Sequence, residues 1–144
     1  MGKMMRTASP SCQVALPEMP RYRRTMTYTL LHGDDPSIES FRGVFMKIRR
    51  ALGTTAFGIN EVRMAPDSSG MEHDEAETGH EEVYLVLDGS GAFTVDGERV
   101  TVTTGDYLLV GASLTRQVHS GAAGMRFLVV GAQPKAAYDG RESL

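Results

Sequence analysis

Short apolar or alternating runs, separated by turn residues, follow one another through the larger part of the chain. Runs such as EEVYLVL, RVTVTT and MRFLVV are rich in β-branched residues and have the length of strands. Asp96-Gly97 is the sharpest turn signal because two-residue hairpin turns favour this pair, and Ser120-Gly121 separates two later runs. Many short strands at even spacing predict a mainly β domain over residues 55–133, built as an antiparallel sandwich or barrel.

The apolar positions before this β-rich part have a different spacing. Six of them recur at intervals of three or four residues, as on one face of a helix: Ile38, Phe41, Val44, Phe45, Ile48 and Leu52. Asp35 can cap such a helix, and Gly53 can end it. Together with the TMTYTLL run at 25–31, the pattern predicts that residues 26–54 form a strand and one amphipathic helix that packs on the barrel.

The two ends of the chain show no such period. Residues 1–25 combine prolines with the basic run PRYRR and predict a flexible N-terminal arm. Residues 134–144 predict a C-terminal tail, since chain ends are poorly ordered unless they are tied down.

Composition narrows the function classes. With 144 residues, 41% of them hydrophobic, the chain fits one globular domain. Cys12 is the only cysteine, which excludes an internal disulfide and a thiolate metal cluster. No apolar run approaches the roughly 18 residues that a membrane helix needs, so we expect a cytoplasmic protein without a membrane partner.

The negative charge of the chain is local. Six of the 18 acidic residues lie within residues 71–82, a segment without lysine or arginine, whereas all 15 basic residues lie elsewhere. A nucleic-acid-binding protein usually presents a basic face, and this distribution argues against such a partner. One acidic segment instead favours the attraction of a cation.

Histidines and glutamates in the acidic segment indicate a candidate metal site. His73 and Glu75 are two residues apart, as are His80 and Glu82, and side chains two apart on a strand share a face. If both pairs lie on extended, neighbouring segments, the four groups converge. Imidazole nitrogen and carboxylate oxygen suit Fe, Mn, Zn, Ni or Cu. The alternative is a solvated acidic loop, because most charge clusters lie at the surface.

The same residues resemble the first motif of the cupin superfamily, which reads roughly G-x5-H-x-H-x3-4-E-x6-G. Glu82 and Gly89 have its final spacing, while His73 takes the place of the first histidine. Glu75 stands where the second histidine is expected. GDYLLVGASLTRQVHS resembles a degenerate second motif, with Arg116 at the position of the last metal-binding histidine. The resemblance implies a single-domain jelly-roll β-barrel, often a homodimer, with its site inside the barrel.

Arg116 leaves two geometries open. A guanidinium has no lone pair to give a metal, so a divalent transition metal would be held by the histidines and glutamates of the first segment: His73, Glu75, His80 and Glu82. In the competing geometry no metal binds. Arg116 then pairs with Glu82 or Glu75, or it presents its fork to an anionic ligand.

The rule that side chains two apart on a strand share a face also predicts residues that line the pocket. Tyr84 and Met71 each share a face with a candidate ligand, and Asn60 can supply an amide. Together with Arg116, these three are the candidate substrate-binding residues. His119 lies three residues from Arg116, so a regular strand places it on the opposite face, as a solvated or hydrogen-bonded histidine.

These observations predict a barrel that binds a small organic molecule in its interior. The resemblance implies a metal-dependent enzyme of the dioxygenase, isomerase, lyase or cyclase type. The alternative is a metal-free binding or sensing module in which Arg116 holds an anionic ligand.

Overall fold

The computed structural model of the protein describes residues 28–134. The predicted arm at 1–25 and nearly all of the predicted tail at 134–144 lie outside the described residues. Within the described part, none of the helices has the length and apolar character that crossing a bilayer requires.

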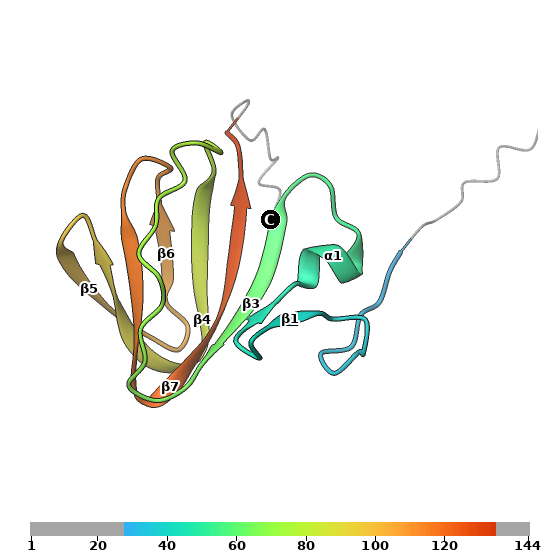
Figure 1. Ribbon diagram of the computed structural model, residues 1–144, viewed down its shortest axis with the longest axis horizontal. Coiled ribbons are helices and arrows are strands. Elements are labelled where there is room, and N and C mark those ends of the chain that lie inside the picture. Colours follow the sequence, from blue (N-terminus) through green and yellow to red (C-terminus); the bar gives the residue numbers. More distant parts are fainter. Residues whose placement is uncertain (1–27, 135–144) are drawn as a thin grey trace, which may run out of the picture.

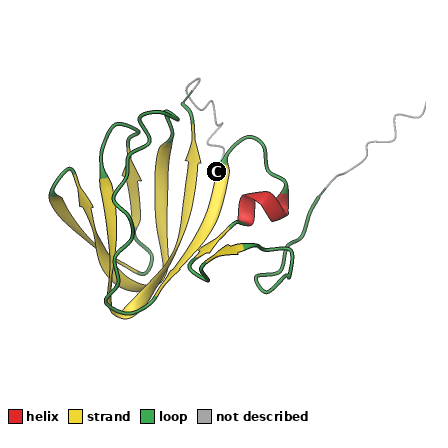
Figure 2. Cartoon of the chain, viewed as in Figure 1, coloured by secondary structure: helices red, strands yellow, loops and turns green. Residues whose placement is uncertain are grey.

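Strands account for most of the described chain, and one helix accompanies them (Figure 2). In chain order the elements are β1 (Ser40–Phe41), β2 (Phe45–Met46), α1 (Ile48–Leu52), β3 (Gly58–Met64), β4 (Glu81–Val95), β5 (Glu98–Thr103), β6 (Tyr107–Val110) and β7 (Arg116–Ala132). The strands form one antiparallel sheet in the order β1-β2-β3-β7-β4-β5, and β6 pairs with β4 (Figure 1). The predicted mainly β, antiparallel fold is confirmed.

The two longest strands, β4 and β7, are the frame of the barrel. They pair from Glu81↔Ala132 at one end to Val95↔Arg116 at the other, with register shifts after Val86 and after Gly89. Each of them joins two runs that turn residues separate in the sequence into one continuous strand. The prediction that Ser120-Gly121 divides two strands is therefore wrong. The shifts bend β4 without interrupting its pairing, which lets one long strand contribute to two sides of the barrel.

The connection between β3 and β4, residues 65–80, closes the barrel beside the first half of β7 (Figure 1). It runs antiparallel to β7, with isolated bridges at Ser69↔His119 and His73↔Arg116. The backbones of His73 and Arg116 exchange two hydrogen bonds, of 3.1 and 2.8 Å. The connection therefore behaves as an extra, irregular edge of the sheet.

The predicted turn at Asp96-Gly97 is confirmed. It joins β4 to β5, and both residues have positive φ, 45° and 84°. This is the backbone that a two-residue hairpin turn requires, and an aspartate followed by glycine tolerates it best.

The predicted long helix is wrong in its extent. Only Ile48–Leu52 are helical, while Phe41 and Phe45 lie opposite each other in the β1–β2 hairpin. Arg42 and Gly43 have φ of 54° and 70°, so the chain reverses where a helix would continue. Residues 28–31, the described part of the predicted first strand, form no strand. The predicted helix end at Gly53 is confirmed, since it adopts the left-handed conformation.

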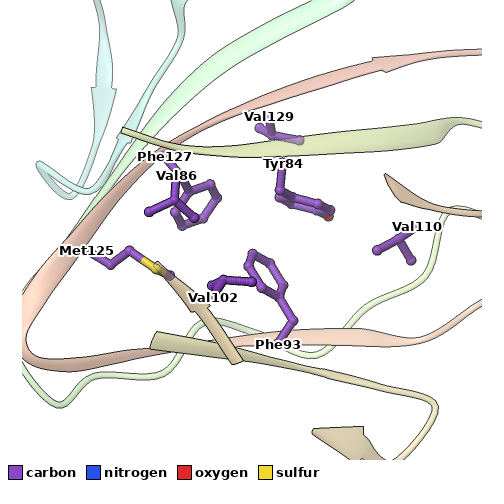
Figure 3. Close-up of a cluster of buried hydrophobic side chains, with 8 residues drawn as sticks. All are labelled: Tyr84, Val86, Phe93, Val102, Val110, Met125, Phe127 and Val129. Carbon is purple, nitrogen blue, oxygen red and sulfur yellow. The ribbon is translucent and has the colours of Figure 1, made fainter. Parts of the chain in front are cut away.

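The core lies between the inward faces of β4, β5, β6 and β7 (Figure 3). Its buried members are Tyr84, Val86, Phe93, Val102, Val110, Met125, Phe127 and Val129. Three aromatic rings pack at its centre, with the centroids of Tyr84 and Phe93 4.7 Å apart and those of Phe93 and Phe127 5.8 Å apart. Tilted contacts of this kind add to the stabilisation that apolar burial provides.

Replacing Gly91 with alanine should destabilise the fold. A Cβ at this position would lie 2.1 Å from the backbone oxygen of His119, so β4 and β7 would have to separate. We expect a loss of about 1–3 kcal/mol in the free energy of unfolding, as for other overpacked sites. Gly111→Ala is the matched control, because its Cβ would meet no atom within 4 Å. Equal urea midpoints for the two variants would contradict the close approach of the strands.

Candidate metal and ligand site

The polar side chains inside the barrel come from a regular strand and from an irregular connection. Glu82 and Tyr84 lie on the inward face of β4, whereas His73 and Glu75 lie on the 65–80 connection. The backbone N–H of Glu75 donates to the carbonyl of Ala112, 2.9 Å away. Together with the His73–Arg116 backbone pair, this bond ties the connection to β7 and to the segment that follows β6.

The structure brings three of the four predicted metal ligands together. One donor atom from each of His73, Glu75 and Glu82 lies within 4.8 Å of the other two. Glu82 is partly buried, and its Oε2 lies 4.0 Å from Nε2 of His73. Nδ1 of His80, the fourth predicted ligand, lies 3.9 Å from Oε2 of Glu75 but outside this set. Residues 76–79 form turns, so the rule that side chains two apart share a face does not relate His80 to His73 and Glu75.

Arg116 points into the barrel and is almost completely buried, with 1% of its side chain exposed. Its Nη2 lies 3.4 Å from Oε2 of Glu82, and its Nη1 donates to the carbonyl of Leu114 at 2.9 Å. Among the described residues, Nε and Nη2 find no hydrogen-bond partner. Buried donors of this kind carry a desolvation cost unless another group accepts from them.

Tyr84 completes the surroundings of Glu82. Its hydroxyl donates to Oε2 of Glu82 at 2.5 Å. Burial, reinforced by the Glu82 carboxylate, holds the pKa of the Tyr84 phenol well above its ordinary value. The phenol therefore stays protonated over the physiological range and acts as a permanent donor to the carboxylate.

Two cavities meet at this cluster and share four wall residues: Phe45, His73, Glu82 and Val129. The first, which we call the polar chamber, has a volume of about 930 Å³ and includes Asn60, Glu75, His80 and Gln133 in its wall. The second, the apolar chamber, has a volume of about 380 Å³ and is lined by Arg116 and mostly apolar side chains, including Met71, Tyr84, Phe93, Val118 and Phe127. Volumes in this range accommodate small organic molecules.

The predicted pocket residues all reach a chamber, although not the same one. Asn60 lines the polar chamber, while Tyr84, Arg116 and Met71 line the apolar one. Met71 lies at a rim, with 83% of its surface exposed. The sequence did not point to Phe45, because its spacing placed it in the predicted helix.

The imidazole of His119 lies away from the Glu82 cluster. Its Nδ1 lies 2.8 Å from Oγ of Ser69, and its Nε2 lies 3.1 Å from Oγ1 of Thr94. Both ring nitrogens are thus occupied by hydroxyl groups. The prediction of a hydrogen-bonded histidine outside the ligand set agrees with this arrangement.

The donor set fits a divalent transition metal. Nitrogen and oxygen donors bind such ions at about 2.0–2.2 Å, so two ligands of one ion lie up to about 4.2 Å apart. The donor atoms of His73, Glu75 and Glu82 all lie within 4.8 Å of one another, which is close to this range. Three protein ligands leave coordination positions open, as in catalytic sites. Arg116 occupies the neighbouring position without a lone pair to donate.

The comparisons with known proteins place the chain in a family. A cupin-domain family model matches residues 60–131, which is half of the chain. The protein therefore belongs to the cupin family, as the resemblance of its motifs predicted. No curated protein matches the chain significantly.

Solved structures support the same fold. A cupin protein from Bacteroides fragilis matches with a TM-score of 0.59 and 22% identity, over 67% of this chain and 86% of the other. A predicted oxalate decarboxylase from Thermotoga maritima matches with a TM-score of 0.52 and 24% identity, over 59% of this chain and 73% of the other. At these identities the similarity establishes the fold alone.

Neutralising Glu82 should destabilise the metal-free protein. Glu82→Gln would leave the guanidinium of Arg116 buried without a counter-charge, and we expect a loss of about 3 kcal/mol in the free energy of unfolding. Glu81→Gln is the matched control, because Glu81 precedes it on β4 but is exposed. That variant should stay within about 0.5 kcal/mol of wild type. Urea denaturation with chelator present measures both, and a Glu82→Gln protein as stable as the control would show that Arg116 does not depend on this carboxylate.

Proposed function

We propose that this cupin barrel binds a small organic molecule beside a divalent transition-metal ion held by His73, Glu75 and Glu82. The convergence of one imidazole and two carboxylates at the junction of the two chambers carries the proposal. Two carboxylates this close repel each other, and a bound cation removes that repulsion. A ligand in either chamber would reach the ion, since His73 and Glu82 face both.

A metal bound here would supply Lewis-acid polarisation of a ligand oxygen or activation of dioxygen. The protein's own residues supply orientation. The Tyr84 hydroxyl and the Arg116 guanidinium both lie against Oε2 of Glu82 and restrict the rotation of this carboxylate. Such supporting contacts outside the ligand set typically tune metal affinity. The wall of the polar chamber adds the Asn60 amide for a polar ligand group.

A metal-free binding module is the second candidate. Nη2 of Arg116 already lies 3.4 Å from Glu82, so a positive charge compensates this carboxylate without a metal. A further cation would meet repulsion from the guanidinium. In this candidate the chambers bind a small molecule through their walls alone. The homodimer, the cytoplasmic location and the absence of a nucleic-acid partner remain predictions.

Metal titration of the chelator-treated protein tests the first candidate. We expect one Zn²⁺ or Mn²⁺ ion per chain by calorimetry, and at least an about tenfold loss of affinity in Glu75→Gln and in His73→Gln. His80→Gln should change the affinity less than threefold, because His80 lies outside the donor set. Glu77→Gln controls for the general charge of the segment, since Glu77 is exposed. Less than about one-tenth of an ion per chain after reconstitution would reject the metal and favour the second candidate.

A further inference from the structure

The guanidinium of Arg116 has unused hydrogen-bonding capacity, and Arg116 lines the apolar chamber. It is 1% exposed, and its Nη1 is engaged by the carbonyl of Leu114. Nε and Nη2 are buried without a hydrogen-bond partner among the described residues. These two atoms form one edge of the planar guanidinium fork, which matches the two oxygens of a carboxylate.

The charge of the site depends on whether a metal is bound. Without one, the carboxylates of Glu75 and Glu82 outweigh the guanidinium of Arg116, and these three groups together carry a formal charge of minus one. Arg42 and Arg49 also line the chambers, but both are exposed, where solvent and salt screen their charges. An anion would then be repelled. A divalent cation reverses the sign and leaves one positive charge. One bound monoanion would neutralise it, so metal and monoanion should favour each other's binding.

The walls of the apolar chamber define the rest of the ligand. Apart from Arg42, His73, Glu82 and Arg116, they present mostly aromatic and aliphatic side chains, with Tyr84, Phe93 and Phe127 grouped together. A cavity of about 380 Å³ with this lining accommodates a small ring or short alkyl body. A polar body would lose hydration without gaining partners.

We propose that Arg116 anchors the carboxylate of a small aromatic or aliphatic monocarboxylic acid in the apolar chamber, and that this anchoring requires the metal ion at His73, Glu75 and Glu82. The inference rests on the proposed function and adds to it the class of ligand. Arg116 is on this account the residue that selects acids over neutral molecules.

Calorimetry with matched acids and amides tests the proposal. Benzoate, phenylacetate and hexanoate are titrated against benzamide, phenylacetamide and hexanamide, using the full chain with Zn²⁺ bound or after chelation. We expect at least one acid to bind the Zn²⁺-loaded protein tenfold or more tightly than its amide. The same acid should bind tenfold or more weakly after chelation.

The Arg116→Gln variant separates anchoring by arginine from direct ligation of the metal by the acid. The variant should lose the preference for the acid while keeping or gaining affinity for Zn²⁺, because a positive charge beside the ion is gone. Arg99→Gln is the matched control, since Arg99 is exposed on β5 and lines neither chamber, and it should keep the preference. If Arg116→Gln does not fold, Arg116→Lys retains the charge without the fork and should lose most of the preference.

The outcomes distinguish this inference from the proposed function. If Zn²⁺ binds but no acid outcompetes its amide, or if Arg116→Gln keeps the preference, the anchoring is wrong and the metal site stands. If the acid binds equally well after chelation, the dependence on the metal is wrong. If Zn²⁺ does not bind at all, the proposed function fails and this inference fails with it.

Discussion

The burial of one permanently charged side chain constrains much of this barrel. Arg116 cannot lose its proton at any physiological pH, so its charge must be balanced where it lies. Transferring an unpaired ion into a protein interior costs several kcal/mol even after relaxation. Glu82 provides the balance from the neighbouring strand, and Tyr84 in turn donates to Glu82. The inward face of β4 is therefore polar at one end and apolar beyond it.

The same arginine links the strands to the connection that covers them. Its backbone exchanges two hydrogen bonds with His73, so the imidazole is placed beside Glu82 through the residue whose side chain also contacts Glu82. Glu75 follows on the same connection and is held through Ala112. Two candidate ligands thus come from an irregular segment and one from a regular strand. A cation between them would tie the connection to β4, which joins ligand binding to the closure of the barrel.

The sequence predicted those parts of the fold that depend on local chemistry. Asp96 and Gly97 indicate their turn because few residue types accept positive φ. The alternate residues from Glu82 to Val86 form the inward face of β4, as predicted. The predicted extent of the helix was wrong because the apolar residues at 38–52 are spread over the β1–β2 hairpin and α1, and their combined spacing resembles that of one helix. Arg42 has a positive φ, which cannot be predicted from its residue type. Long-range pairing, not local preference, decides this region.

The sequence predicted the candidate site where side chains two residues apart face the same way. Glu82, Tyr84 and Arg116 lie on paired strands, so their sequence positions fix which way they face. His80 follows a series of turns, and no rule based on alternate residues applies across them. Phe45 belongs to a hairpin whose existence depends on pairing with β3, which the sequence does not display. The sequence therefore predicted the grouping of His73, Glu75 and Glu82, whereas the placement of His80 and Phe45 needed the structure.

A metal ion and the Arg116–Glu82 ion pair need not exclude each other, because the contacts described for Glu82 involve one of its two oxygens. The Tyr84 hydroxyl, Nη2 of Arg116 and Nε2 of His73 all approach the same oxygen, Oε2, at 2.5, 3.4 and 4.0 Å. A carboxylate offers about four lone-pair directions on its two oxygens, so Oε1 still has acceptor capacity for an ion. Repulsion between that ion and the guanidinium falls when an anion lies between them or beside them. If the metal and the acid bind as proposed, the departure from the family pattern at Arg116 changes which ligands the barrel favours more than whether it can hold a metal.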